Sequence, residues 1–367
     1  MREQVPAALL RFAKLRGQIQ PQTYVMSETA WRMFGLHLMK TVGLTYDLKT
    51  DYKFKEGDPP DANAEFDHPS TIDVISKAID ACGFKVKRIG NVNNLLEKID
   101  SLDVDIVFNI SEGISGRNRE SQVPILLEIA GIPFVGADAL TLGLTLDKVM
   151  AKKIFIAEKI PTPKFFEVKT QDELLNCDHC KFPLIVKPRF EGSSKGLSES
   201  SRVENIEELK KQVDYVVNTY KQPALVEEFI SGQEFTVAIV GNEPPEAMPI
   251  VQIKIDGRLQ LNDKFYTFAR ITSNRLEYIC PAHINQDLKN KIYDLSLKTY
   301  RAVECRDFGR VDFRVDSEGR PYVLEINPLP SLSTEDVFML VAKNIGISYE
   351  EMIGKILTSA IIRHNLN

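Results

Sequence analysis

The 367-residue sequence has no long apolar run, and none approaches the roughly 20 residues that a membrane-spanning helix needs. Near its beginning, a short apolar run is interrupted by Arg11, Lys14 and Arg16, a pattern unlike that of a secretory signal peptide. The sequence also contains no internal repeat and no low-complexity tract. These absences predict a protein of the cytoplasm that does not contact membranes.

An excess of positive charge is missing as well. The 46 Lys and Arg residues face 51 Asp and Glu residues, which gives a formal net charge of −5. Nucleic-acid-binding proteins usually carry a basic face, so nucleic acid is not expected as a partner. A local pair such as Lys152 and Lys153 can still bind an anion if it converges with other groups in space.

Cysteine is rare, odd in number and dispersed, which is typical of reduced thiols in a cytoplasm. The five positions are Cys82, Cys177, Cys180, Cys280 and Cys305. The segment CDHC at 177–180 resembles half of a zinc or redox site. Because it has no second Cys pair, a metal role is the less favoured interpretation.

The pattern of apolar runs divides the sequence into regions. Residues 1–35 are expected to form an amphipathic helix and an irregular arm. In residues 36–146, apolar runs alternate with helical stretches, which predicts a parallel sheet with helices on its faces. Ligands of such sheets bind at the carboxyl ends of the strands. The polar segments after VGLTYDL and DIVFNI are therefore candidate substrate loops.

Two further regions follow. Residues 147–222 are expected to form a smaller α/β unit with a strand at FPLIVKP, a glycine-serine turn and one long helix. In residues 223–367 strands dominate, and helices at 285–303 and 333–360 flank them. The fold class is therefore α/β with three parts.

Near the C-terminus, two predicted strands carry acidic side chains among apolar ones. The segments VDFRV and YVLEI flank DSEGRP, a turn signal that contains Gly319. With the turn near 317–318, position 312 is expected opposite 323, and 310 opposite 325. Alternation then places these apolar side chains on one face: Val311, Phe313, Val315, Tyr322, Leu324 and Ile326. The other face carries Arg310, Asp312, Glu325 and Asn327.

Two carboxylates and an amide on a rigid hydrophobic layer suit Mg²⁺, which takes oxygen ligands and keeps bonds to phosphates. Arg310 on the same face could hold an anion. A solvated sheet face with an Arg–Glu cross-strand pair is the alternative interpretation of these residues.

A candidate phosphate-binding segment is IVKPRFEGSSKG, residues 185–196. Lys187 ends a strand, and the small residues that follow let backbone N–H groups approach phosphate oxygens. The glycine spacing is not that of a Walker motif, and an ordinary flexible loop is the alternative. Lys148, which opens a helix after Asp147, is a further candidate cation, although an exposed lysine on a helix is far commoner.

A candidate nucleoside-binding segment is ALVEEFISGQEFTVAIVG, residues 224–241. Glu227, Glu228 and Glu234 bracket a short connection between two strands. Such a connection can offer backbone groups to an adenine edge and a carboxylate to ribose hydroxyls. Charged ends of exposed strands are the alternative.

In order and spacing, LTLDK, the VKP segment with EGSSKG, EEFISGQE and the RVDF–LEIN hairpin resemble the ATP-grasp superfamily, most closely its D-alanine–D-alanine ligase branch. The resemblance runs from about Ala64 to the C-terminal helix. It implies an N-terminal parallel-sheet domain (the pre-ATP-grasp domain), a small central α/β lid and a C-terminal, mainly antiparallel catalytic sheet with helices. ATP and two Mg²⁺ ions, or Mn²⁺ instead, are the implied cofactors.

The resemblance also implies roles for individual residues. Catalytic roles are implied for Arg310 at the acyl phosphate and tetrahedral intermediate, Glu65 at the ammonium of the first substrate, and Ser193 in the glycine-rich loop that closes over ATP. Metal ligands would be Asp312, Glu325 and Asn327. The nucleotide would be held by residues of four segments: Lys148, Lys187, Glu191, Gly192, Ser193, Ser194, Gly196, Glu227, Glu228, Ile230 (through its backbone), Glu234 and Arg270.

The sequence departs from the family pattern where the second substrate would bind. Glu112 stands where a histidine is usual, and Arg117 and Arg119 are added nearby. Ser331 replaces a glycine, and Asp336 falls near a serine that holds the second substrate's carboxylate. An aspartate would repel a carboxylate. The acceptor is therefore expected not to be D-alanine, or its carboxylate binds at Arg117 or Arg119; local misalignment is the alternative.

The predicted activity is that of an ADP-forming carboxylate–amine ligase that joins amino acids or a small peptide through an acyl phosphate. The resemblance further suggests a homodimer. Two alternatives are kept: a catalytically inactive ATP-binding regulator, and a small-molecule kinase that stops at the acyl phosphate.

Overall fold

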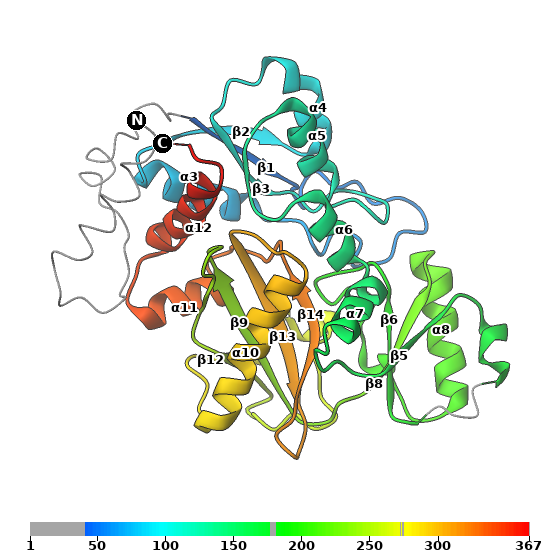
Figure 1. The fold of residues 1–367 in the computed structure, drawn as a ribbon. Coiled ribbons are helices and arrows are strands. Elements are labelled where there is room, and N and C mark those ends of the chain that lie inside the picture. The colour runs from blue at the N-terminus through cyan, green and yellow to red at the C-terminus, as the bar shows by residue number, and fades with distance from the viewer. Residues whose placement is uncertain (1–40, 177–180, 272, 274, 367) are drawn as a thin grey trace.

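The computed structural model describes residues 41–176, 181–271, 273 and 275–366, and Figure 1 shows three sheets with their helices. The predicted arm at 1–35 and the CDHC segment lie outside the described residues. The N-terminal sheet is parallel, with the order β2 (Lys85–Gly90), β1 (Thr41–Tyr46), β3 (Ile106–Ile110) and β4 (Phe134–Val135). This agrees with the predicted alternation of strands and helices.

Helices cover both faces of this sheet because the side chains of β3 alternate between two cores. Phe108 packs in one core with α3 (Pro69–Ala81), whereas Val107 packs in the other with α4 (Val92–Lys98) and α5 (Gln122–Ala130). Sequence signals bound these helices: Pro69 opens α3, and Gly131, at φ +68°, ends α5.

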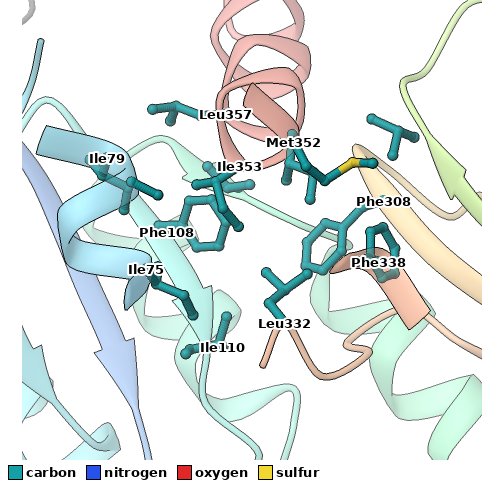
Figure 2. Packing of buried hydrophobic residues seen from close by; sticks show 14 of the residues in the cluster. Ile75, Ile79, Phe108, Ile110, Phe308, Leu332, Phe338, Met352, Ile353 and Leu357 are labelled. Atoms are coloured by element: carbon teal, nitrogen blue, oxygen red, sulfur yellow. The ribbon is translucent and has the colours of Figure 1, made fainter. Parts of the chain in front are cut away.

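The C-terminal helix α12 (Tyr349–Arg363) packs on the N-terminal sheet beside α3 (Figure 1). Figure 2 shows its Ile353 and Leu357 against Ile79 and Phe108. In the same cluster, the ring of Phe308 lies 6.4 Å from that of Phe108 and 6.1 Å from that of Phe338. One hydrophobic core therefore joins the two ends of the described chain.

The central unit is an antiparallel sheet with the order β5 (Phe165–Val168), β8 (Ala224–Glu228), β6 (Leu184–Pro188) and β7 (Arg202–Val203), covered by α8 (Ile206–Tyr220). Strand β8 corrects one expectation from the sequence, which assigned this segment to the C-terminal region. It lies between β5 and β6, because the chain returns to the central sheet after α8.

The C-terminal sheet is antiparallel, with the order β12 (Leu276–Ile279), β11 (Val251–Ile255), β9 (Gln233–Val240), β13 (Phe308–Val315) and β14 (Pro321–Asn327); β10 (Glu246–Ala247) pairs with β9. One face packs on α7 (Lys148–Ala157) and α10 (Gln286–Ala302). The remaining short elements are α6 (Ala139–Leu146), α9 (Phe268–Ile271), α11 (Val337–Ile345), and 3-10 turns at Ile99–Ser101, Gln171–Asn176 and Glu199–Ser201.

The β13–β14 hairpin forms as predicted, but its register differs. Asp312 lies opposite Glu325, not residue 323, and Arg310 lies opposite Asn327. The cause is a bulge at Leu324, where the ladder steps from the Asp312–Glu325 pair to the Phe313–Val323 pair. Val323 therefore joins the core, whereas the sequence had placed Tyr322 and Leu324 there.

Within the described ranges, no helix combines the length and the apolar character that crossing a bilayer requires.

The shared core around Phe308 generates a stability prediction. Phe308→Ala should lower the free energy of unfolding by about 3–5 kcal/mol, because it leaves a cavity among fully buried side chains. Denaturant unfolding of the full chain measures this. The matched control is Phe54→Ala at a side chain that is 55% exposed, where a loss of about 1 kcal/mol or less is expected. Equal losses in the two variants would contradict the joint core.

Candidate active site

A cavity of about 830 Å³ lies where the three sheets meet. Most residues predicted for the site line it: Glu65, Glu112, Lys148, Lys187, Glu191, Gly192, Ser193, Ser194, Glu227, Glu228, Ile230, Glu234, Arg310, Asp312, Glu325, Asn327, Ser331 and Asp336. These residues are spread over more than 270 positions of sequence (336 − 65 = 271), and folding brings them to one place.

The floor of the cavity includes the acidic side chains of the β13–β14 hairpin. Asp312 accepts hydrogen bonds from Thr236 Oγ1 at 2.6 Å, Arg310 Nε at 3.0 Å and Asn327 Nδ2 at 3.0 Å. Glu325 is its cross-strand neighbour. Adjacent, antiparallel strands thus hold two carboxylates and one amide in a fixed arrangement.

This donor set fits a hard divalent cation. Carboxylate and amide oxygens are the ligands that Mg²⁺ prefers. Because Nδ2 of Asn327 donates to Asp312, its carbonyl oxygen is the atom that remains to act as a ligand. Among the described residues, no group of three or more His, Cys, Asp and Glu side chains could hold a metal ion, so the hairpin's two carboxylates need the Asn327 oxygen to complete the set.

Lys148 lies above this floor because it begins α7. Its Nζ donates to Glu325 Oε2 at 2.5 Å. Burial opposes the charge of Glu325, but the ammonium groups of Lys148 and Lys187 outweigh burial and lower the pKa of Glu325 to about 2. Asp147 is the N-cap of the helix and accepts from the Met150 N–H, so the direction of Lys148 is set by the cap.

Lys187 on β6 pairs with Glu227 on β8, with Nζ 2.6 Å from Oε2. The other oxygen of Glu227 lies 2.5 Å from Nζ of Lys152. The sequence had named Lys152 only as part of a possible anion site with Lys153, and its pairing with Glu227 was not foreseen. The signal that could have indicated it was the spacing of four residues from Lys148, which places both lysines on one face of α7. Burial opposes ionisation of Glu227, yet the two lysines lower its pKa to about 2.

Glu234, the expected ribose ligand, is buried at the start of β9. Burial raises its pKa to about 7, with Arg314 opposing the shift from 3.6 Å away. The pairing of β9 and β13 places Arg314 directly opposite Glu234. Arg314 also lines the cavity, and alternation along VDFRV could have indicated this position.

The glycine-rich loop contacts the N-terminal domain through Glu65. One carboxylate oxygen of Glu65 accepts from Gly192 N at 2.6 Å and from Arg119 Nη2 at 2.7 Å. The other accepts from Lys195 Nζ at 3.1 Å. Ser193 and Ser194 both have positive φ, +46° and +56°, a strained conformation that turns the loop toward the cavity.

Four predicted residues do not line the cavity. Arg117 donates two hydrogen bonds to Asp147, and Arg119 donates to the Phe190 carbonyl as well as to Glu65. Arg270 is tied to the Phe265 carbonyl and to Glu199, and the Gly196 N–H donates to Asp61. Their side chains or backbone groups serve buried polar networks around the site.

The fold and the cavity define an ATP-grasp enzyme, because two α/β units enclose lysines and a glycine-rich loop opposite paired carboxylates. A crystal structure of D-alanine–D-alanine ligase from Bacillus anthracis complexed with ATP matches with a TM-score of 0.70 at 23% identity, over 89% of this chain and 99% of that one. Residues 155–358 match the family model described as the D-ala D-ala ligase C-terminus.

Two relatives extend the match. A D-alanine–D-alanine ligase of Carboxydothermus hydrogenoformans is 35% identical over 296 residues, 78% of this chain and 91% of the relative. An uncharacterized protein of Sinorhizobium fredii is 39% identical over 259 residues, 71% of this chain and 75% of the relative. The chain belongs to the D-alanine–D-alanine ligase family, which confirms the resemblance seen in the sequence.

The Lys152–Glu227–Lys187 triad generates a pH prediction. The pKa of Glu227 falls from an ordinary 4.5 to about 2 on folding, so its stabilisation is present above pH 4.5 and is lost as pH falls toward 2. Glu227→Gln should cost about 3–5 kcal/mol near neutral pH, because two buried lysines lose their partner.

Thermal midpoints of both proteins across this range measure the effect, and the gap between them should narrow as pH falls. Glu228→Gln, at the exposed next position of β8, is the matched control and should leave the midpoint nearly unchanged. A gap that stays constant down to about pH 2 would contradict the pKa assignment.

Proposed function

We propose that this protein is an ADP-forming ligase that phosphorylates a carboxylate and joins it to an amine. The observation that carries the proposal is one cavity in which Lys148 and Lys187 face the hairpin of Arg310, Asp312 and Glu325. Cations opposite a metal-binding floor suit the transfer of a phosphoryl group, whose transition state spreads negative charge over its oxygens.

Each step then has candidate residues. Lys148 and Lys187 would neutralise the nucleotide phosphates, and the N–H groups of Ser193 and Ser194 would cover them. A substrate carboxylate oxygen attacks the terminal phosphorus, which forms an acyl phosphate and releases ADP. Arg310 would stabilise the oxyanion when an amine attacks the acyl carbon; phosphate leaves, and the amine nitrogen loses a proton.

Asp312, Glu325 and Asn327 are the residues that would hold Mg²⁺, or Mn²⁺, and the ion would offset phosphate charge. Burial of Glu234 at the cavity wall supports a contact with a nucleoside hydroxyl rather than with a phosphate. The proposed substrates are amino acids or a small peptide, in line with the relative from Carboxydothermus hydrogenoformans, which is a D-alanine–D-alanine ligase.

The acceptor is proposed not to be D-alanine. Asp336 lines the cavity at the start of α11, where the family's carboxylate-holding serine is expected. The alternative carboxylate sites at Arg117 and Arg119 are not favoured, because neither residue lines the cavity and both bind buried acidic groups. D-alanyl-D-alanine as the preferred product would contradict this part.

A cytoplasmic location and a homodimer belong to the same proposal; the first rests on the cysteine content and the second on the family resemblance. The activity is tested by ADP release with a panel of D- and L-amino acids. Release that needs an added amine indicates a ligase, and release without one indicates a kinase. No release despite ATP binding would indicate the inactive regulator.

Glu325→Gln tests the metal floor. Turnover should fall by about a hundredfold or more, because the substitution removes one charge from both the metal set and the Lys148 pair. Phosphate release measures turnover, and circular dichroism checks the fold. Glu318→Gln, at the exposed turn of the same hairpin, is the matched control and should retain activity. Near-normal turnover in Glu325→Gln would count against the assignment.

A further inference from the structure

One group of residues that line the cavity is acidic. It comprises residues of the N-terminal domain and of the segment that leads into α11: Asp67, Glu112, Glu120, Glu335 and Asp336. Few cationic side chains line the cavity near these acidic residues. Lys49 lies near Asp67, His68 is exposed, and Arg310 is engaged by Asp312.

Glu120 is the most informative member of this group. It is only 8% exposed, it lines the cavity, and it makes no hydrogen bond or ion pair within the part of the chain that the structure describes. Its carboxylate oxygens are not among the fully buried atoms that lack a partner, so the small exposed part of this side chain faces the cavity. A positively charged group of a ligand in the cavity would supply the missing partner.

The pKa values of Glu120, Glu112 and Asp67 show that these carboxyl groups also lack enough positive charge around them. Burial raises the pKa of Glu120 to about 8 despite Arg119, whose guanidinium is already bound to Glu65. Burial and the carboxyl group of Glu120 raise the pKa of Glu112 well above its ordinary value. Burial likewise raises the pKa of Asp67 to about 7, with Lys49 opposing and Asp336 adding to the shift.

The charges of these side chains also interact with one another and with two cations. Glu120 interacts with Lys148 at the phosphate end, Glu112 with Glu120 and Asp67, and Asp67 with Asp336. Asp336 in turn interacts with Arg310, where the amine would attack. We call Glu120, Glu112, Asp67 and Asp336, which all line the cavity and are near enough for their charges to interact, the acidic row.

We propose that the acceptor is a diamine, whose second ammonium group binds this acidic row, rather than an amino acid with a carboxylate. The inference rests on the proposed ligase function. One amine of the acceptor would attack the acyl phosphate at Arg310, and the other would take the position of the missing partner of Glu120 and its neighbours. An acceptor carboxylate would instead meet Asp336 and be repelled.

Three probes of equal chain length separate these possibilities. They are 1,4-diaminobutane, 1-aminobutane and 4-aminobutyrate, which end in a positive, a neutral and a negative group. With ATP, Mg²⁺ and an amino-acid donor, phosphate release should be at least about tenfold faster with the diamine than with 4-aminobutyrate. Equal or faster release with 4-aminobutyrate or with D-alanine would overturn the proposal while leaving the ligase function standing.

Binding is measured separately by calorimetry, so a result is obtained even if no amine supports turnover. The full chain should bind 1,4-diaminobutane about tenfold or more tightly than 1-aminobutane, and Glu120→Gln should abolish most of this difference. The matched control is Glu128→Gln, an exposed position of α5, which should bind like the unmodified protein. No preference for the diamine would overturn the proposal.

Asp336→Ser tests whether Asp336 repels an acceptor carboxylate, and it should shift the preference from the diamine toward 4-aminobutyrate. Serine retains the N-cap of α11, so the helix start is preserved while the negative charge is removed. Phosphate release with 4-aminobutyrate should rise by about tenfold relative to release with the diamine. An unchanged ratio would overturn the role of Asp336 in selecting the acceptor.

Discussion

The geometry of the cavity depends on the hydrogen bonds that the buried carboxylate of Asp147 accepts. It is fully buried, and it accepts from Arg117 of the N-terminal domain, from Arg189 of the central unit and from the Met150 N–H. A buried charge is tolerated only with such partners. Because α7 begins here, Asp147 also determines where Lys148 points and, one turn later, where Lys152 lies. Three parts of the chain therefore meet at one side chain.

Local patterns in the sequence were sufficient for the parts of the site whose residues are close along the chain. The hairpin of Asp312 and Glu325 follows from alternation and a turn, and the loop 191–196 follows from its glycines and serines. Contacts between distant residues were not predictable in this way. Arg117 and Arg189 reach Asp147 across 30 and 42 positions, and Glu65 reaches Gly192 across 127. Nothing in the local pattern marks such partners.

Because local patterns do not reveal contacts between distant residues, the observed fold also differs in places from the fold expected from the sequence. The bulge at Leu324 shifts the hairpin register, because strand length and turn type alone do not reveal an extra residue. Strand β8 reads as a generic apolar run, and only its position between β5 and β6 assigns it to the central sheet. Glu120 lies in a polar segment, and its burial without a partner becomes visible only when the cavity is assembled.

The charges of the cavity divide into two halves that need different ligands. At the phosphate end, Glu325 and Glu227 are each paired with a lysine. The phosphates of a bound nucleotide would therefore compete with these two carboxylates for the lysines. Glu65 is likewise matched, by Arg119 and Lys195, and it links the N-terminal domain to the loop over the phosphates. The row from Glu120 to Asp336 lacks such partners. In the proposed reaction, the ammonium group of the acceptor would therefore meet this row rather than Glu65, whose oxygens already have donors.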